Sequence, residues 1–200
     1  MKQIFNSSFS RSPKVSFLLL DWNCRESFHS LEYFNDQTVA RDKYELIWIE
    51  FYDREVEEIK SKLDESPRLK KHPILDQWIV MGFPKDSYYH KHLMYNLGIV
   101  ASRGEIVVIC DSDVMVTPTL VEAIVESFEE SQKKNQNLVL HLDEVRSGYR
   151  GFYPFNYPSF EDVKEIESIN WKDGTTTGLL DKVDPIHTLN YGACMCARRD

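Results

Sequence analysis

A short apolar run that ends in two aspartates constrains the fold of this chain more than any other feature. Residues 106–110 are all apolar, and Asp111, Ser112 and Asp113 follow them directly. Such a run is typical of a buried strand, so both carboxylates are expected at one edge of a sheet. Carboxylates in this position suit Mg²⁺ or Mn²⁺, whose shell is completed by water and substrate phosphates. The pair therefore predicts a diphosphate-bearing ligand, although Asp-x-Asp is also common in ordinary turns after strands.

Composition limits the classes of protein that the chain can belong to. Its 200 residues, 42% of them hydrophobic, can bury one sizeable core. The net charge of −8 and the lack of a dense Lys/Arg stripe argue against a nucleic-acid partner. No apolar run approaches the roughly 18 to 20 residues of a transmembrane segment. The four cysteines have neither zinc-type spacing nor the density of a disulfide scaffold, so we expect a cytoplasmic protein.

Periodicity predicts alternating strands and helices. We expect strands at residues 15–20, 44–51, 78–81, 106–110, 138–142 and 191–197, because each run is apolar and of strand length. Helices are expected around residues 28–34 and at 55–65, 87–102, 117–134 and 161–169, with Thr117 as the cap and Pro118 as the first residue of the fourth. Residues 173–178 are expected to form a polar loop. The alternation favours a parallel sheet.

An aromatic segment at residues 148–158 contains five Tyr and Phe side chains around glycine and proline. Such a loop either stacks on a sugar or covers an edge of the core, and the sequence leaves both interpretations open.

Several segments in chain order resemble one enzyme family. They are similar to a GT-A glycosyltransferase of the family-two type, and comprise the first strand with Asn23 after it, the Asn96-Leu97-Gly98 helix, the Asp-x-Asp sequence and the segment 190–200. Residues 20–22 depart from the Pro-Thr-Tyr-like sequence that usually ends the family's first strand. This resemblance implies an α/β fold of the GT-A (Rossmann-like) kind, with a mostly parallel sheet flanked by helices in a single domain. That domain is expected to span residues 14–200, after an N-terminal extension at 1–13.

The same resemblance implies which residues bind the donor. A Mn²⁺ or Mg²⁺ ion is expected on Asp113 and Asp111, with Asp113 as the direct ligand and Asp111 facing ribose or metal-bound water. Glu50, beside Asp21 at the carboxyl edge of the sheet, is expected to read the nucleotide base. The full set of expected nucleotide-sugar contacts is Leu20, Asp21, Trp22, Glu50, Asn96, Asp111 and Ser112.

The implied reaction moves a sugar from a nucleotide-diphosphate sugar, with UDP favoured, to an acceptor hydroxyl with inversion. The acceptor is a glycan, a lipid or a small molecule, and polysaccharide biosynthesis is the implied setting. The catalytic base is expected after residue 200, so the acceptor side of the domain is expected to be incomplete. The chain departs from the family's pattern at two further places: residues 51–53 replace the family's usual Asp-Gly-Ser, and Tyr95 replaces an Arg that is frequent in the family.

Two alternatives remain open at this stage. A haloacid-dehalogenase-type phosphatase would use Asp111 as nucleophile and Asp113 as acid, but its motif normally begins the fold. A non-catalytic binding module with a transferase-like fold is favoured by the departures at residues 21–22 and 51–53.

Overall fold

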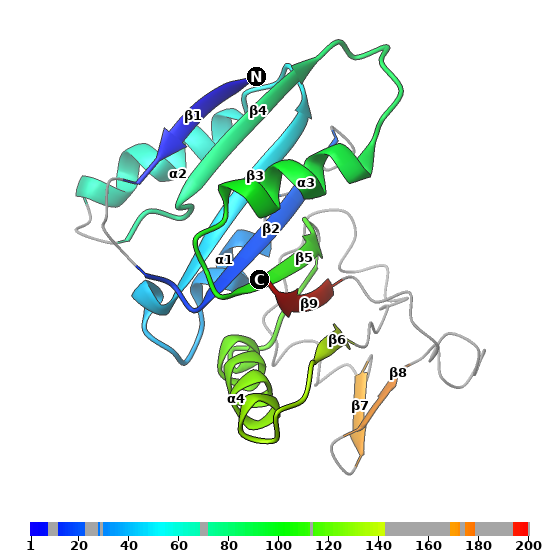
Figure 1. The fold of residues 1–200 in the computed structure, drawn as a ribbon. Helices are drawn as coiled ribbons and strands as arrows, with labels where there is room; N and C mark the ends of the chain where they lie inside the picture. Colours follow the sequence, from blue (N-terminus) through cyan, green and yellow to red (C-terminus); the bar gives the residue numbers. More distant parts are fainter. Residues whose placement is uncertain are drawn as a thin grey trace. The chain divides into compact units, whose positions relative to one another are not determined.

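A mostly parallel sheet of seven strands organises the chain (Figure 1). The computed structural model describes residues 1–7, 12–22, 28, 30–68, 72–112, 114–142, 169–172, 175–178 and 194–199. The order of the strands is β1-β4-β3-β2-β5-β9-β6. They are β1 (Lys2–Asn6), β2 (Val15–Asp21), β3 (Tyr44–Tyr52), β4 (Gln77–Phe83), β5 (Ile106–Asp111), β6 (Val139–Leu142) and β9 (Cys194–Arg198).

The strand directions confirm the predicted fold class. β2 is parallel to both β3 and β5, and β3 is parallel to β4, whereas β1 pairs with β4 in the antiparallel sense. The chain forms two compact units, residues 1–140 with 195–200, and residues 141–194. The second unit contains an antiparallel pair, β7 (Ile169–Lys172) and β8 (Thr175–Gly178). The sheet begins before residue 14, because β1 lies in the segment expected as an extension.

In the described residues, four α-helices and one short 3₁₀ helix accompany the strands. They are α1 (Ser30–Asn35), η1 (Arg41–Lys43), α2 (Glu57–Arg68), α3 (Lys91–Ala101) and α4 (Leu120–Lys133). Figure 1 shows α3 lying across β2 and β3, and contacts with both strands place it on that face. Because α3 connects β4 to β5, it runs back along the sheet and begins near the carboxyl ends of the strands.

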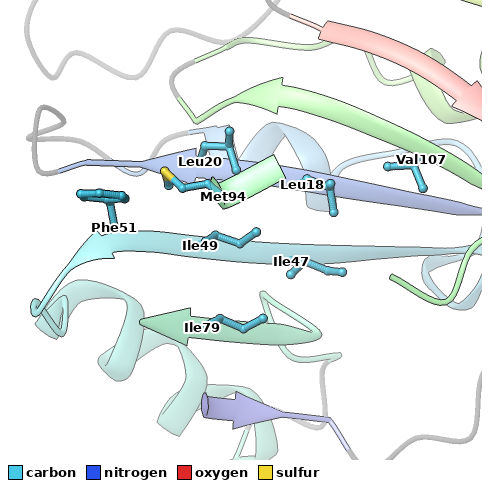
Figure 2. Close-up of a cluster of buried hydrophobic side chains, with 8 residues drawn as sticks. All are labelled: Leu18, Leu20, Ile47, Ile49, Phe51, Ile79, Met94 and Val107. Atoms are coloured by element: carbon cyan, nitrogen blue, oxygen red, sulfur yellow. The ribbon is translucent and has the colours of Figure 1, made fainter. Parts of the chain in front are cut away.

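A hydrophobic cluster fixes α3 to the sheet. Met94 of α3 packs with alternate residues of β2 and β3, and Figure 2 shows it beside Leu20. The buried members are Leu18, Leu20, Ile47, Ile49, Phe51, Ile79, Met94 and Val107. Gly98 allows the close approach, since a Cβ there would lie 2.7 Å from Cδ1 of Leu18 and 2.8 Å from Cδ1 of Ile49.

Two buried polar networks hold the amino ends of the strands. Nη2 of Arg41 lies 2.7 Å from Oδ2 of Asp76, which also accepts the Leu46 backbone N–H at 2.9 Å. In the second network Oε2 of Glu45 lies 2.7 Å from Nη2 of Arg103, and the Ser16 hydroxyl donates to Oε1 of Glu45 at 2.6 Å. These contacts join the starts of β2, β3 and β4 to the residues before β5.

The helix boundaries differ from those predicted at two places. α3 begins at Lys91 and not at residue 87, because His90 has an extended backbone and the Tyr52 hydroxyl donates to the Ser87 carbonyl at 3.2 Å. α4 begins at Leu120 after Thr119, so the prediction that Thr117 caps it and Pro118 begins it was wrong. The side chain of Gln37 explains the shift, since it donates to the Thr117 carbonyl and accepts the Val121 N–H.

One further expectation was wrong, and one feature was not anticipated. Residues 175–178 form β8 and not a loop, in agreement with the strand preference of three consecutive threonines. Cys110 and Cys194 are disulfide-bonded, although the cysteine usage gave no reason to expect a disulfide. Disulfides are rare in a reducing cytosol, so these cysteines do not favour the expected cytoplasmic location. The aromatic segment 148–158 and most of the helix expected at 161–169 lie outside the described residues.

No helix in the part of the chain that the structure describes has the length and apolar character needed to cross a membrane.

Candidate functional site

Three acidic residues, Asp21, Glu50 and Asp111, lie at the carboxyl edge of the sheet, where β2, β3 and β5 end. The strand register pairs Asp21 with Glu50 and Leu20 with Asp111, so the three strands end at the same level. Asp21 and Glu50 are each 0% exposed, whereas the Asp111 side chain is 30% exposed. Ligands of open parallel sheets bind at this edge, so the register alone builds a polar site there.

Glu50 has a strongly raised pKa. Burial first and the negative charge of Asp21 second raise the pKa from 4.5 to about 8, although Arg54 and a hydrogen bond from the Tyr52 backbone N–H act in the opposite direction. Among the described residues neither carboxyl oxygen has a hydrogen-bond partner of normal geometry. Glu50 is therefore chiefly a neutral acid at pH 7, with donor and acceptor capacity left for a ligand.

Arg54 brings a cation to the two buried acids. Its Nη1 lies 3.8 Å from Oδ2 of Asp21, and its guanidinium carbon lies 5.8 Å from the centre of the Phe28 ring. Within the described residues Nη1 is buried without a hydrogen-bond partner. The group of Asp21, Glu50 and Arg54 thus presents both donors and acceptors in a confined space.

Lys91 covers the aspartate of β5. Its Nζ lies 2.6 Å from Oδ1 of Asp111 and 5.7 Å from the ring centres of both Trp22 and Tyr95. Burial acts to lower the pKa of Lys91, but its interactions with Asp111 and Tyr95 outweigh burial and raise the pKa. Trp22 is itself held by Tyr89, with the two rings stacked at 4.5 Å.

The structure brings together four of the residues expected from the sequence: Asp21, Trp22, Glu50 and Asp111. Ser112 adjoins them; it is buried, and its carbonyl accepts a hydrogen bond from the Ser30 hydroxyl at 2.6 Å. The Leu20 side chain points into the hydrophobic cluster instead (Figure 2), which leaves its backbone as the part that reaches the edge. Asn96 is exposed on α3, more than one turn beyond Lys91. Asp113 lies outside the described residues.

A divalent cation at this edge would need ligands besides the described side chains. The described residues contain no group of three or more His, Cys, Asp and Glu side chains that could hold a metal ion by themselves. Mg²⁺ and Mn²⁺ commonly use one or two carboxylates and complete their shell with water and phosphate oxygens.

Sequence reasoning missed Lys91, Arg54 and Tyr89. For Lys91 a signal was present, because it lies one helical turn before Tyr95, the position where the family has a frequent Arg. Arg54 follows β3 in a segment without periodicity, and nothing in the sequence relates it to Asp21.

Comparison with solved structures identifies the fold. TarS 1–349 from S. aureus matches with a TM-score of 0.51 and 16% identity, over 69% of this chain and 37% of that protein. TarS 1–349 in complex with UDP-GlcNAc matches with a TM-score of 0.50 and 15% identity, over 68% of this chain and 36% of that one. The chain has the GT-A fold. It spans little more than a third of the length of these two proteins, and at such identities the likeness concerns the fold alone. No family model and no curated protein sequence matches the chain.

Proposed function

We propose that this chain binds a nucleotide-diphosphate sugar and a divalent cation at the carboxyl edge of its sheet, and that it takes part in transfer of the sugar to an acceptor hydroxyl. The observation that carries the proposal is the alignment of Asp21, Glu50 and Asp111 at one edge, where the buried Glu50 oxygens have no hydrogen bond of normal geometry among the described residues. A buried polar group without a partner is costly, and a ligand that hydrogen-bonds to it recovers that cost.

Each residue has a role in the proposed site. Glu50, assisted by Arg54, reads the base, since the two offer both a donor and an acceptor. Asp111 and Asp113 hold Mn²⁺ or Mg²⁺, which neutralises the charge that develops on the leaving diphosphate. We favour UDP as the nucleotide and inversion as the stereochemical course, and the catalytic base is not among the residues assigned here. The acceptor is a glycan, a lipid or a small molecule, and a glycan would place the reaction in polysaccharide biosynthesis.

The phosphatase alternative loses its support with this fold. In the described sheet the Asp-x-Asp sequence follows β5, after four other strands, and not the strand that begins the fold. A binding module without catalysis remains the second candidate, and turnover of a panel of nucleotide sugars separates it from a transferase.

Nucleotide binding tests the proposal directly. Thermal unfolding should be measured with UDP, GDP, CDP and ADP, each with Mn²⁺ or with excess chelator. We expect UDP to stabilise the chain only with Mn²⁺, by about 2.7 kcal/mol at 100 times its dissociation constant. Asp111→Asn should lose this increment while remaining folded. Glu50→Leu should reduce the preference among the four bases about tenfold or more, because the hydrogen bonds to the base are removed.

Two results would each overturn one part of the proposal. Equal stabilisation in the presence of chelator would exclude metal bridging, and a Glu50→Leu variant with unchanged base preference would place base reading elsewhere.

A further inference from the structure

Lys91 occupies a position at the site that the Asp-x-Asp sequence does not explain. It is the first residue of α3, and its ammonium group touches one carboxylate, that of Asp111, at 2.6 Å. Tyr95 also forms a side-chain hydrogen bond with the ammonium group, and the faces of Trp22 and Tyr95 each lie 5.7 Å from Nζ. Aromatic faces attract a cation without accepting conventional hydrogen bonds. An ammonium group has three donors, of which Asp111 and Tyr95 engage two, so one donor remains for an anionic ligand.

The ammonium group is also accessible to a ligand. The side chains of Lys91 and Asp111 are 34% and 30% exposed, in contrast to the fully buried Asp21 and Glu50. Lys91 is also the first residue of α3, and among the described residues the His90 side chain makes no capping hydrogen bond to this helix. The partial positive charge of a helix N-terminus favours an anion near it.

The site needs such a cation. Besides the neutral Glu50 it contains Asp21 and Asp111, and the whole chain carries a net charge of −8, so a polyphosphate meets repulsion unless local cations offset it. Arg54 lies against Asp21 among the buried groups, whereas Lys91 lies at the partly exposed aspartate of β5.

We propose that Lys91 is a positioning residue that binds the diphosphate of the donor, and that Asp111 and the Trp22 and Tyr95 rings hold its ammonium group in place for this task. The inference rests on the proposed donor-binding function. Lysine is a common phosphate ligand that acts as a point charge, and contacts between an ammonium group and a phosphate are strong, charge-assisted hydrogen bonds. Lys91 and a divalent cation then share Asp111, so removal of the ammonium group should increase the affinity of this aspartate for Mn²⁺.

The comparison of UDP with uridine isolates the contact to the phosphates. Dissociation constants for both should be measured with Mn²⁺ in the wild type, Lys91→Met and Lys91→Arg, together with Mn²⁺ binding in the absence of nucleotide. We expect Lys91→Met to weaken the binding of UDP about tenfold and to change the affinity for uridine less than about twofold. The same variant should bind Mn²⁺ alone more tightly than the wild type. Lys91→Arg should retain UDP binding to within about threefold. Lys85→Met, at an exposed lysine six residues earlier, is the matched control and should leave both ligands unchanged.

The outcomes separate the inference from the function on which it rests. UDP binding by the wild type that Lys91→Met leaves unchanged would overturn the role of Lys91 and leave the donor site standing. An equal loss of UDP and uridine would show a structural role and would also overturn it. A wild type that binds neither ligand would overturn both proposals. If Lys91→Met does not fold, Lys91→Gln gives the same comparison, because it keeps a polar side chain without the charge.

Discussion

At the scale of single residues, Glu50 makes the stability of the folded chain depend on pH. It is buried beside Asp21, and its pKa of about 8 lies far above the 4.5 of an ordinary glutamate. Below about pH 4.5 the folded and unfolded chains both hold the proton. Between pH 4.5 and 8 only the folded chain holds it, so stability falls as the pH rises through this window, by at most about 1.4 kcal/mol per pH unit.

The substitution Glu50→Gln removes this dependence, because the amide resembles the neutral acid in shape and does not titrate. We expect the free energy of unfolding of the variant, relative to the wild type, to increase by about 3 to 4 kcal/mol between pH 5 and 8. Urea unfolding at several pH values measures the difference. Glu57→Gln is the control, since the Glu57 side chain is 83% exposed, and its difference from the wild type should stay nearly constant. Parallel stability curves for Glu50→Gln and the wild type would mean that Glu50 is ionised in the folded chain.

At the scale of elements, the sequence predicted well those elements that a local pattern stabilises, and predicted poorly those that depend on contacts with distant residues. β2, β3 and β5 were predicted almost to the residue, because a strand buried on both faces needs a continuous apolar run. The start of α4 was misplaced by two to three residues, since Gln37, more than 80 residues earlier, supplies the hydrogen bond that a local cap would have made. A contact between distant segments leaves no local pattern in the sequence.

The close packing of α3 against the sheet at Gly98 gives a prediction at this scale. Gly98→Val places a branched side chain against Leu18 and Ile49, where even one added carbon lies within 3 Å of their terminal carbons. We expect a loss of about 1 to 3 kcal/mol in the free energy of unfolding, because the buried neighbours must move. Because α3 also carries Lys91, nucleotide affinity should decrease as well. Leu93→Val, at a side chain 45% exposed on the same helix, should cost less than about 0.5 kcal/mol. Equal stability of the two variants would show that α3 is not fixed at Gly98.

At the scale of the whole sheet, the two ends of the strands are built differently. The amino ends carry paired charges, Arg41 with Asp76 and Glu45 with Arg103, whereas the carboxyl ends carry the under-satisfied Glu50 and the accessible Asp111. The sequence was sufficient to predict that Asp21, Glu50 and Asp111 share an edge, because strand ends in a parallel sheet are aligned. It was insufficient for Lys91 and Arg54, whose placement depends on where α3 begins and how the chain turns after β3.

This division predicts that stability and ligand binding can be separated by substitution at opposite ends of the sheet. Arg41 is paired with a fully buried Asp76, so Arg41→Met leaves a buried carboxylate without its cation and should cost about 3 to 5 kcal/mol of stability. Its affinity for UDP with Mn²⁺ should stay within about twofold of the wild type, because no contact of Arg41 reaches the carboxyl edge in the described chain. Asp111→Asn should show the reverse, with a stability change below about 1 kcal/mol because its ion pair is partly exposed, and with loss of the metal-dependent binding. Urea unfolding and calorimetric titration of the same preparations measure both quantities. If both variants lost binding and stability together, the two ends of the sheet would act as one cooperative unit, and the assignment of the carboxyl edge as a separate binding site would fail.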